Sequence, residues 1–91
     1  MAAVYMSLGD GYTEKAPAFR PTEAVSTIAD ATSSTQTDPL GGGVLRVFAS
    51  AAVYYSIGSN PTASSNSHFL PATTPYDIVV KNGERVAFLN A

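Results

Sequence analysis

The sequence has no cysteine and no tryptophan, and His68 is its single histidine. Without cysteine, the chain forms no disulfide, no thiolate metal site and no cysteine nucleophile. With one histidine, it cannot build a multi-histidine metal site within a single chain. We therefore expect no metal and no cofactor.

Charge is also scarce, because charged residues are 13% of the chain, about half the usual share for a soluble protein. The formal net charge of −2 provides no basic footprint for a nucleic acid. No apolar run approaches the roughly 20 residues of a membrane-spanning helix, and residues 1–5 show no signal-peptide pattern. We expect no nucleic-acid partner and no membrane partner, with synthesis in the cytoplasm.

Helical patterns are nearly missing. Within residues 21–31, Val25, Ile28 and Ala29 have helical spacing, so a helix is one alternative there. The segment lacks leucine, lysine and arginine and runs into a Thr/Ser-rich stretch, which favours a strand over residues 24–29.

Strand patterns are stronger in the middle of the chain. The segments 44–49 and 52–57 are rich in β-formers, and the short gap at residues 50–51 predicts a hairpin between them. Gly58 and Pro61 then provide a turn, since glycine permits a positive φ and proline cannot donate to a strand ladder.

A second hairpin is predicted at residues 76–89, with Asn82-Gly83 as a two-residue type I′ turn. One face of this hairpin is apolar, and the other also carries Val79, Val86 and Phe88. We expect a second sheet to cover one face and a neighbouring subunit to cover the other.

The spacing of strands and turns predicts one all-β domain over residues 1–91, a small β-sandwich or jelly-roll-like barrel of about 6–8 strands. Residues 1–21 are punctuated by glycine and proline and are expected to form an extended N-terminal arm, with one short strand near residues 4–8. Residues 32–43 and 60–74 are expected to be polar connections.

No residue pattern supports an enzyme. His68 lies near Ser65 and Ser67, but a serine hydrolase also needs an orienting acid and an oxyanion hole. The glycines at 41–43 lack the Lys-Ser/Thr of a phosphate-binding loop, and a strand follows them. The aspartates at 10, 30 and 38 lack the spacing of a calcium loop.

Tyr54 and Tyr55 point to opposite sides of their predicted strand, so at least one of them points away from the local core. An outward tyrosine serves as a platform for a sugar or as an oligomer contact. We favour the contact, because no cluster of rings and amides accompanies it.

Three stretches carry a resemblance to a known class of protein. They are VYYSIGSNPTA at residues 53–63, LPA at 70–72 and GERVAF at 83–88. In this order after the Gly-rich residues 41–43, they are similar to small virion structural proteins of tailed bacteriophages. The similarity covers residues 41–90, and residues 1–40 match only loosely.

The resemblance implies a capsid decoration or cement protein that binds the outer surface of the phage head and stabilises contacts between major capsid subunits. Its implied partners are the major capsid protein and further copies of itself, as a dimer or trimer, and its implied location is the virion. Contacts are expected from the arm and from aromatic side chains. The expected contact residues are Met6, Tyr12, Phe19, Tyr54, Tyr55 and Phe88.

Two alternatives remain open on the same resemblance. One is a tail- or spike-associated module that binds a host glycan, for which exposed tyrosines and Ser/Asn-rich loops are suited. The other is a head–tail or baseplate adaptor, which is also structural but has a different copy number.

Overall fold

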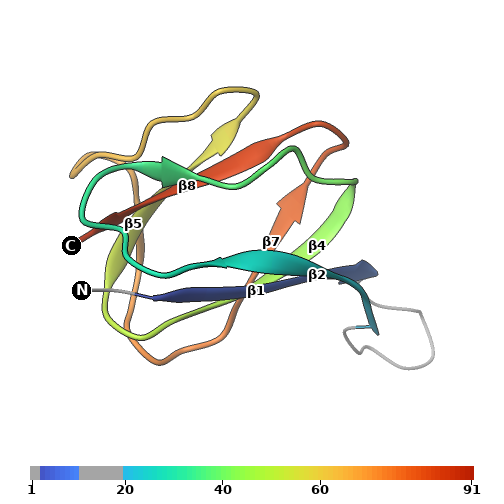
Figure 1. Cartoon of the computed structure of the whole chain (residues 1–91), viewed down its shortest axis with the longest axis horizontal. Coiled ribbons are helices and arrows are strands. Elements are labelled where there is room, and N and C mark those ends of the chain that lie inside the picture. Colours follow the sequence, from blue (N-terminus) through green and yellow to red (C-terminus); the bar gives the residue numbers. More distant parts are fainter. Residues whose placement is uncertain (1–2, 11–19) are drawn as a thin grey trace.

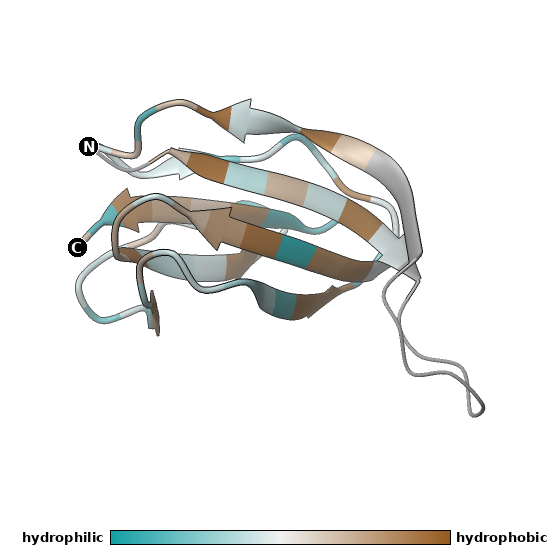
Figure 2. Cartoon of the chain, turned by 90° about the horizontal axis from the view of Figure 1, so that it is seen from below, coloured by the Kyte–Doolittle hydropathy of each residue, from teal (hydrophilic) through white to brown (hydrophobic). Residues whose placement is uncertain are grey.

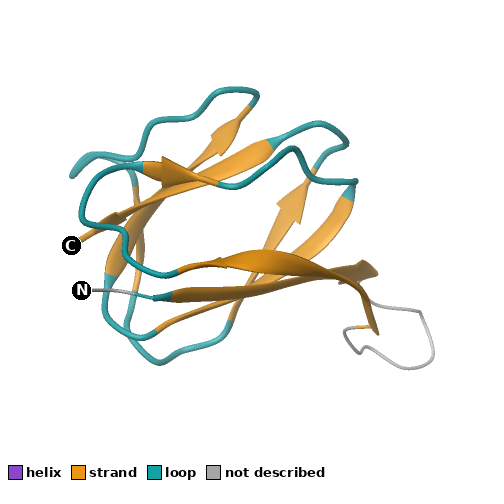
Figure 3. Cartoon of the chain, viewed as in Figure 1, coloured by secondary structure: helices purple, strands orange, loops and turns teal. Residues whose placement is uncertain are grey.

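A computed structural model describes residues 3–10 and 20–91, with the backbone alone for residues 10 and 20–23. Every regular element in this part of the chain is a strand, as Figure 3 shows. The strands form two antiparallel four-stranded sheets that face each other (Figure 1). The predicted β-sandwich is therefore confirmed.

Sheet A has the strand order β2-β1-β4-β7, and sheet B has the order β3-β8-β5-β6. Sheet A comprises β1 (Val4–Asp10), β2 (Arg20–Ile28), β4 (Gly43–Ala49) and β7 (Tyr76–Val80). Sheet B comprises β3 (Thr35–Gln36), β5 (Val53–Gly58), β6 (His68–Leu70) and β8 (Arg85–Asn90). The strand prediction for residues 24–29 is confirmed as far as Ile28, and the helix alternative is wrong.

The core lies between the sheets and follows from alternation along the strands. Figure 2 shows bands of alternating hydropathy along β1, the strand that begins beside the N marker. Alternate residues of a strand point to opposite faces, so one set of side chains meets the other sheet. The largest fully buried side chains are Phe88, Leu45, Leu70, Val4, Val47, Val53 and Val86.

The strand order is that of an eight-stranded jelly roll, except that the strand in the last position of the jelly roll comes first in this sequence. If β2 is counted first and β1 last, the two sheets read 1-8-3-6 and 2-7-4-5. This is the arrangement of the two four-stranded sheets in a jelly roll. Here the N-terminal strand β1 occupies the place of the last jelly-roll strand, between β2 and β4.

Both predicted hairpins are wrong, although their strands are present. β4 and β5 belong to different sheets, as do β7 and β8, so residues 50–52 and 81–84 each cross from one sheet to the other. β8 pairs with β5 and β3 instead of β7. Its three consecutive buried residues, 86–88, suit an inner strand that is covered on both faces.

The turn at Asn82-Gly83 is also of a different type. The Glu84 amide donates to the Lys81 carbonyl (3.0 Å), and Gly83 has φ +87°. Asn82 is not among the described residues with positive φ, whereas a type I′ turn requires positive φ at both central residues. A single positive φ at the third residue is the pattern of a type II turn, whose twist does not match the strands of a two-residue hairpin.

The short strand predicted near residues 4–8 is confirmed, but it is an inner strand of sheet A and not part of an extended arm. Residues 4–10 form β1, which is paired with β2 on one side and with β4 on the other. Val4, Met6 and Leu8 alternate inward and are buried, so the segment contributes side chains to the core. Residues 11–19 lie outside the described part of the chain.

Candidate interaction surface

The outer face of sheet A carries three rows of side chains that run across the strands. The term "outer face of sheet A" refers here to the residues of β1, β4 and β7 that alternate with buried neighbours and so point away from sheet B. It comprises Tyr5, Ser7, Val44, Arg46, Phe48, Asp77 and Val79. The rows are aromatic at one end, polar in the middle and aliphatic at the other end.

The aromatic row joins β1 to β4. Tyr5 and Phe48 are register partners, and their ring centroids are 6.4 Å apart with the planes tilted by 44°. Tyr5 is 50% exposed and Phe48 is half-buried. Such a pair exposes ring area at a small entropic cost, because the rings already hold each other in place.

The polar row contains the ion pair between Arg46 and Asp77. The guanidinium donates to both carboxylate oxygens, at 2.8 and 3.0 Å. The hydrogen bonds from Arg46 lower the pKa of Asp77 below its usual value. The pair therefore stays charged at neutral pH, but it is exposed to water and contributes little to stability. It neutralises the two charges at the centre of an otherwise uncharged face.

The aliphatic row consists of Val44 and Val79, which are register partners in β4 and β7. Val79 is 76% exposed, the largest exposure among the large hydrophobic side chains that the structure describes. Together the rows form a surface with no net charge and with apolar groups at both ends, which is suited to contact with another protein.

The outer face of sheet B differs, because part of it is covered by the chain itself. The connection 59–67 leaves β5 and passes over β8 to reach β3, where Gln36 donates to Asn60 (3.4 Å). The Ala63 amide also donates to the Ser34 hydroxyl oxygen (2.9 Å). This cover explains why Ala87 is fully buried although its strand neighbours point into the core.

The uncovered end of that face carries a second aromatic pair. Tyr54 and Phe69 meet edge to face, with ring centroids 5.9 Å apart, and Phe69 is 54% exposed. Tyr55 points the other way and packs against the core and His68, whose ring centroid is 5.3 Å away. The predicted opposite orientation of the two tyrosines is confirmed.

The other four predicted contact residues are either buried or outside the described part of the chain. Met6 and Phe88 are buried between the sheets, so their side chains are unavailable for a partner. Tyr12 and Phe19 lie outside the described residues. In the sequence, the only sign of the outer face of sheet A is that Tyr5 and Val79 each lie between two apolar residues of a predicted strand, and so point to the opposite side from them.

The predicted turn after β5 also has a different basis. Gly58 is the last residue of β5 and is not among the described glycines with positive φ. Pro61 lies three residues later, half-buried in the connection. The serines near His68 belong to a local turn, in which the Ser67 hydroxyl oxygen accepts from the Ser64 amide (3.0 Å).

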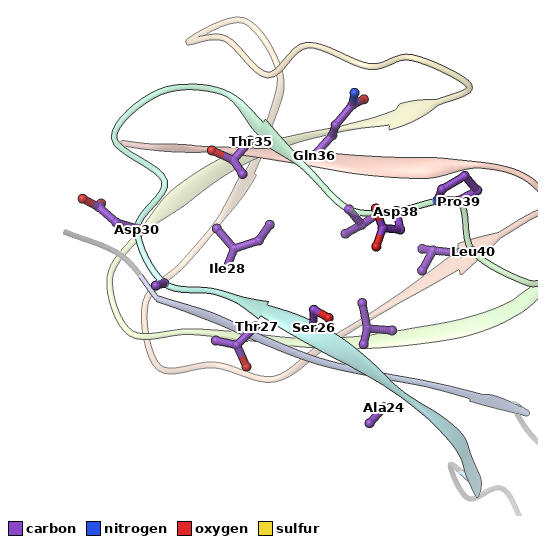
Figure 4. Close-up of a pocket in the computed structure, with 13 residues that line it drawn as sticks. Ala24, Ser26, Thr27, Ile28, Asp30, Thr35, Gln36, Asp38, Pro39 and Leu40 are labelled. Atoms are coloured by element: carbon purple, nitrogen blue, oxygen red, sulfur yellow. The ribbon is translucent and has the colours of Figure 1, made fainter.

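A groove of about 600 Å³ lies between β2 and residues 35–40, where the two sheets diverge (Figure 4). Its buried part consists of Ile28, Thr37 and Leu40. Asp30 lies at one end and Pro39 at the other. The Thr37 hydroxyl oxygen accepts from the Val86 amide (3.1 Å), so its one buried polar side chain already has a partner.

The described residues contain no cluster of three or more His, Asp or Glu side chains with metal-binding geometry. No helix in that part of the chain is long and apolar enough to cross a membrane. In comparisons with known proteins, neither a family model nor a curated sequence nor a solved structure matches the chain.

Proposed function

We propose that this protein is a non-enzymatic structural protein of a bacteriophage particle, a capsid decoration or cement protein. It binds the outer surface of the head and stabilises contacts between major capsid subunits. The observation that carries the proposal is the outer face of sheet A, with apolar rows on either side of a neutralised ion pair. The resemblance of residues 41–90 to small virion proteins supports the same role.

The outer face of sheet A offers the kind of contact that a cement protein needs. A cement protein needs a modest, neutral contact that symmetry repeats many times over a particle, and a sheet face supplies one without a reactive pocket. The low charge of the chain reduces the desolvation cost of bringing two protein surfaces together. Val79 and Tyr5, both exposed, provide apolar area that binding removes from water.

A glycan-binding module of a tail or spike is the second candidate, and one observation favours it. The Tyr54–Phe69 pair lies at the uncovered end of sheet B, near the Ser/Asn-rich connection 59–67. Exposed rings with hydroxyl and amide neighbours are suited to sugar rings. An adaptor at the head–tail junction or baseplate is separated from both by its copy number.

The first test counts copies. Quantitative mass spectrometry of virions from the virus that encodes the chain should find it at a level comparable with the major capsid protein. A handful of copies per particle supports an adaptor or tail module instead. Absence of the chain from purified virions contradicts every virion role.

The second test locates the binding face. Tyr5→Ser removes an exposed ring from sheet A, and we expect affinity for heads lacking this protein to fall roughly tenfold, since burying a large apolar side chain contributes about 1.5–3 kcal/mol. Phe69→Ser is the matched control, because Phe69 is equally exposed but on sheet B. Loss of head binding in the control alone contradicts the assignment to sheet A. Binding to a glycan array that depends on Phe69 supports the second candidate.

A further inference from the structure

Each sheet has two edge strands, whose backbone N–H and C=O groups on the outer side have no partner strand in the described chain. Three of these edges are poor templates for another strand. β2 has two register shifts against β1, after Val4 and after Leu8, which mark bulges or irregular pairing. β3 has two residues and β6 has three, so both are too short for a stable ladder.

The fourth edge, β7, is regular. Its five residues pair with β4 in unbroken register from Tyr76 to Val80, so its outer side is a straight row of alternating donors and acceptors. Its sequence, YDIVV, is rich in β-formers and contains no proline, and its one charged side chain, Asp77, is paired with Arg46 of β4. Val79 exposes its side chain beside this edge.

We propose that β7 pairs antiparallel with β7 of a second copy, about a two-fold axis at Val79. In this register Val79 lies opposite Val79 of the second copy, and Ile78 lies opposite its Val80. Asp77 lies opposite Lys81 of the second copy, and the symmetry repeats that pair. A β7 edge is thus complementary to itself, as a two-fold interface requires.

Charge selects this register over its neighbours. Lys81 follows β7 directly, is exposed, and forms no ion pair with the described residues. An axis at Asp77 places two carboxylates opposite each other, and an axis at Ile78 places Lys81 opposite Pro75. The axis at Val79 instead places each Lys81 opposite an Asp77 whose carboxylate also binds Arg46, and it sets Val79 of one copy beside Val79 of the other.

The consequence is a continuous eight-stranded sheet in which the outer faces of sheet A from both copies adjoin. The contact is narrow, so we expect association that is weak in solution and that increases with protein concentration. The isolated chain should associate in this way whether or not the protein binds a capsid.

A disulfide tests the register, because the chain has no native cysteine. Directly opposed residues of antiparallel strands have Cα atoms about 4.5–5.5 Å apart, within the range a disulfide spans. Val79→Cys should therefore form a covalent dimer on mild oxidation roughly tenfold faster or more than Ser65→Cys, since pairing raises the effective thiol concentration. Ser65 is the control because it is exposed in the connection 59–67, far along the chain from β7.

Sedimentation velocity on the full chain gives an independent measure, over protein concentrations from about 1 μM to about 1 mM. Lys81→Glu should reduce the dimer fraction by placing two acidic pairs across the axis, and Lys81→Arg should preserve it. Equal oxidation rates for the two cysteine variants, or a native chain that stays monomeric throughout, overturns the proposal. A native dimer that Lys81→Glu leaves unchanged overturns the Val79 register.

Discussion

Three consecutive glycines precede or begin β4, and their surroundings make different demands on them. Gly43 has φ +149°, and a Cβ atom there would lie 2.7 Å from the carbonyl oxygen of Gly9 in β1. Gly41 has no positive φ, and its Cβ would meet a Leu8 methyl at 3.7 Å, which is an ordinary contact. The close approach of the β4 and β1 backbones therefore requires glycine at position 43, whereas position 41 accepts a larger residue.

We expect Gly43→Ala to lower the free energy of unfolding by about 2 kcal/mol or more, because the backbone at Gly9 must move and the φ is unfavourable. Thermal unfolding followed by circular dichroism should show a decrease in Tm of roughly 10 °C. Gly41→Ala is the matched control and should leave Tm unchanged or slightly higher. Equal Tm values for the two variants contradict the close packing of β1 against β4.

Strand β1 is the element on which sheet A depends. It pairs with both β2 and β4, and its inward side chains, Val4, Met6 and Leu8, are buried. At about 1.5–3 kcal/mol each, these three side chains alone approach the roughly 5–13 kcal/mol of total stability expected for a domain of this size. Deleting the strand also leaves two inner edges without partners.

We therefore expect a chain that lacks residues 1–10 to lose its cooperative thermal transition and its dispersed amide NMR spectrum. Tyr5→Ala, on the same strand but pointing outward and 50% exposed, should retain both. A cooperative transition in the shortened chain indicates that the sandwich does not need β1 and that residues 1–10 act as an arm.

The sequence predicts which segments are strands better than it predicts their partners. Alternation places β4, β5, β7 and β8 to within a few residues, because burial of one face is a local pattern. The turn at Asn82-Gly83 is equally local, but a turn fixes only four residues. After this turn, β8 can pair beside β7 or cross to the other sheet. It crosses because it pairs with β5 and β3, which are distant in the sequence from the turn.

At the scale of the whole molecule, the candidate surface was predictable only in part. The sequence shows that Val79 lies on a strand with apolar residues on both faces, which indicates a covered or contacting surface. It does not show that Tyr5 and Phe48 share that face, since their pairing joins segments 43 residues apart and requires β1 to enter between β2 and β4. The low charge of the chain indicates a contact surface only once this arrangement is known. The arrangement then shows a sheet face whose charged groups, among the described residues, form a single ion pair.

The place of β1 in the jelly-roll order predicts that the chain tolerates circular permutation. Ala3 accepts a hydrogen bond from Ser50, and Ala91 donates one to Ala52, so Ala3 and Ala91 both adjoin the connection between β4 and β5 (Figure 1). The three residues of that connection, 50–52, span at most about 10 Å, which limits the distance between Ala3 and Ala91. A linker of about six glycine and serine residues, with a mean reach of roughly 13 Å, is long enough to join the ends.

We expect a permuted chain that starts at Ala16 and ends at Lys15, with that linker between Ala91 and Met1, to fold with a Tm within a few degrees of the native chain. None of the described strands is cut, and β1 becomes the last strand, as in an unpermuted jelly roll. A chain opened inside β4, between Arg46 and Val47, is the control and should not fold, because the cut divides an inner strand. Amide NMR dispersion and thermal unfolding distinguish the two, and an unfolded chain from the first opening contradicts the equivalence of β1 with the last jelly-roll strand.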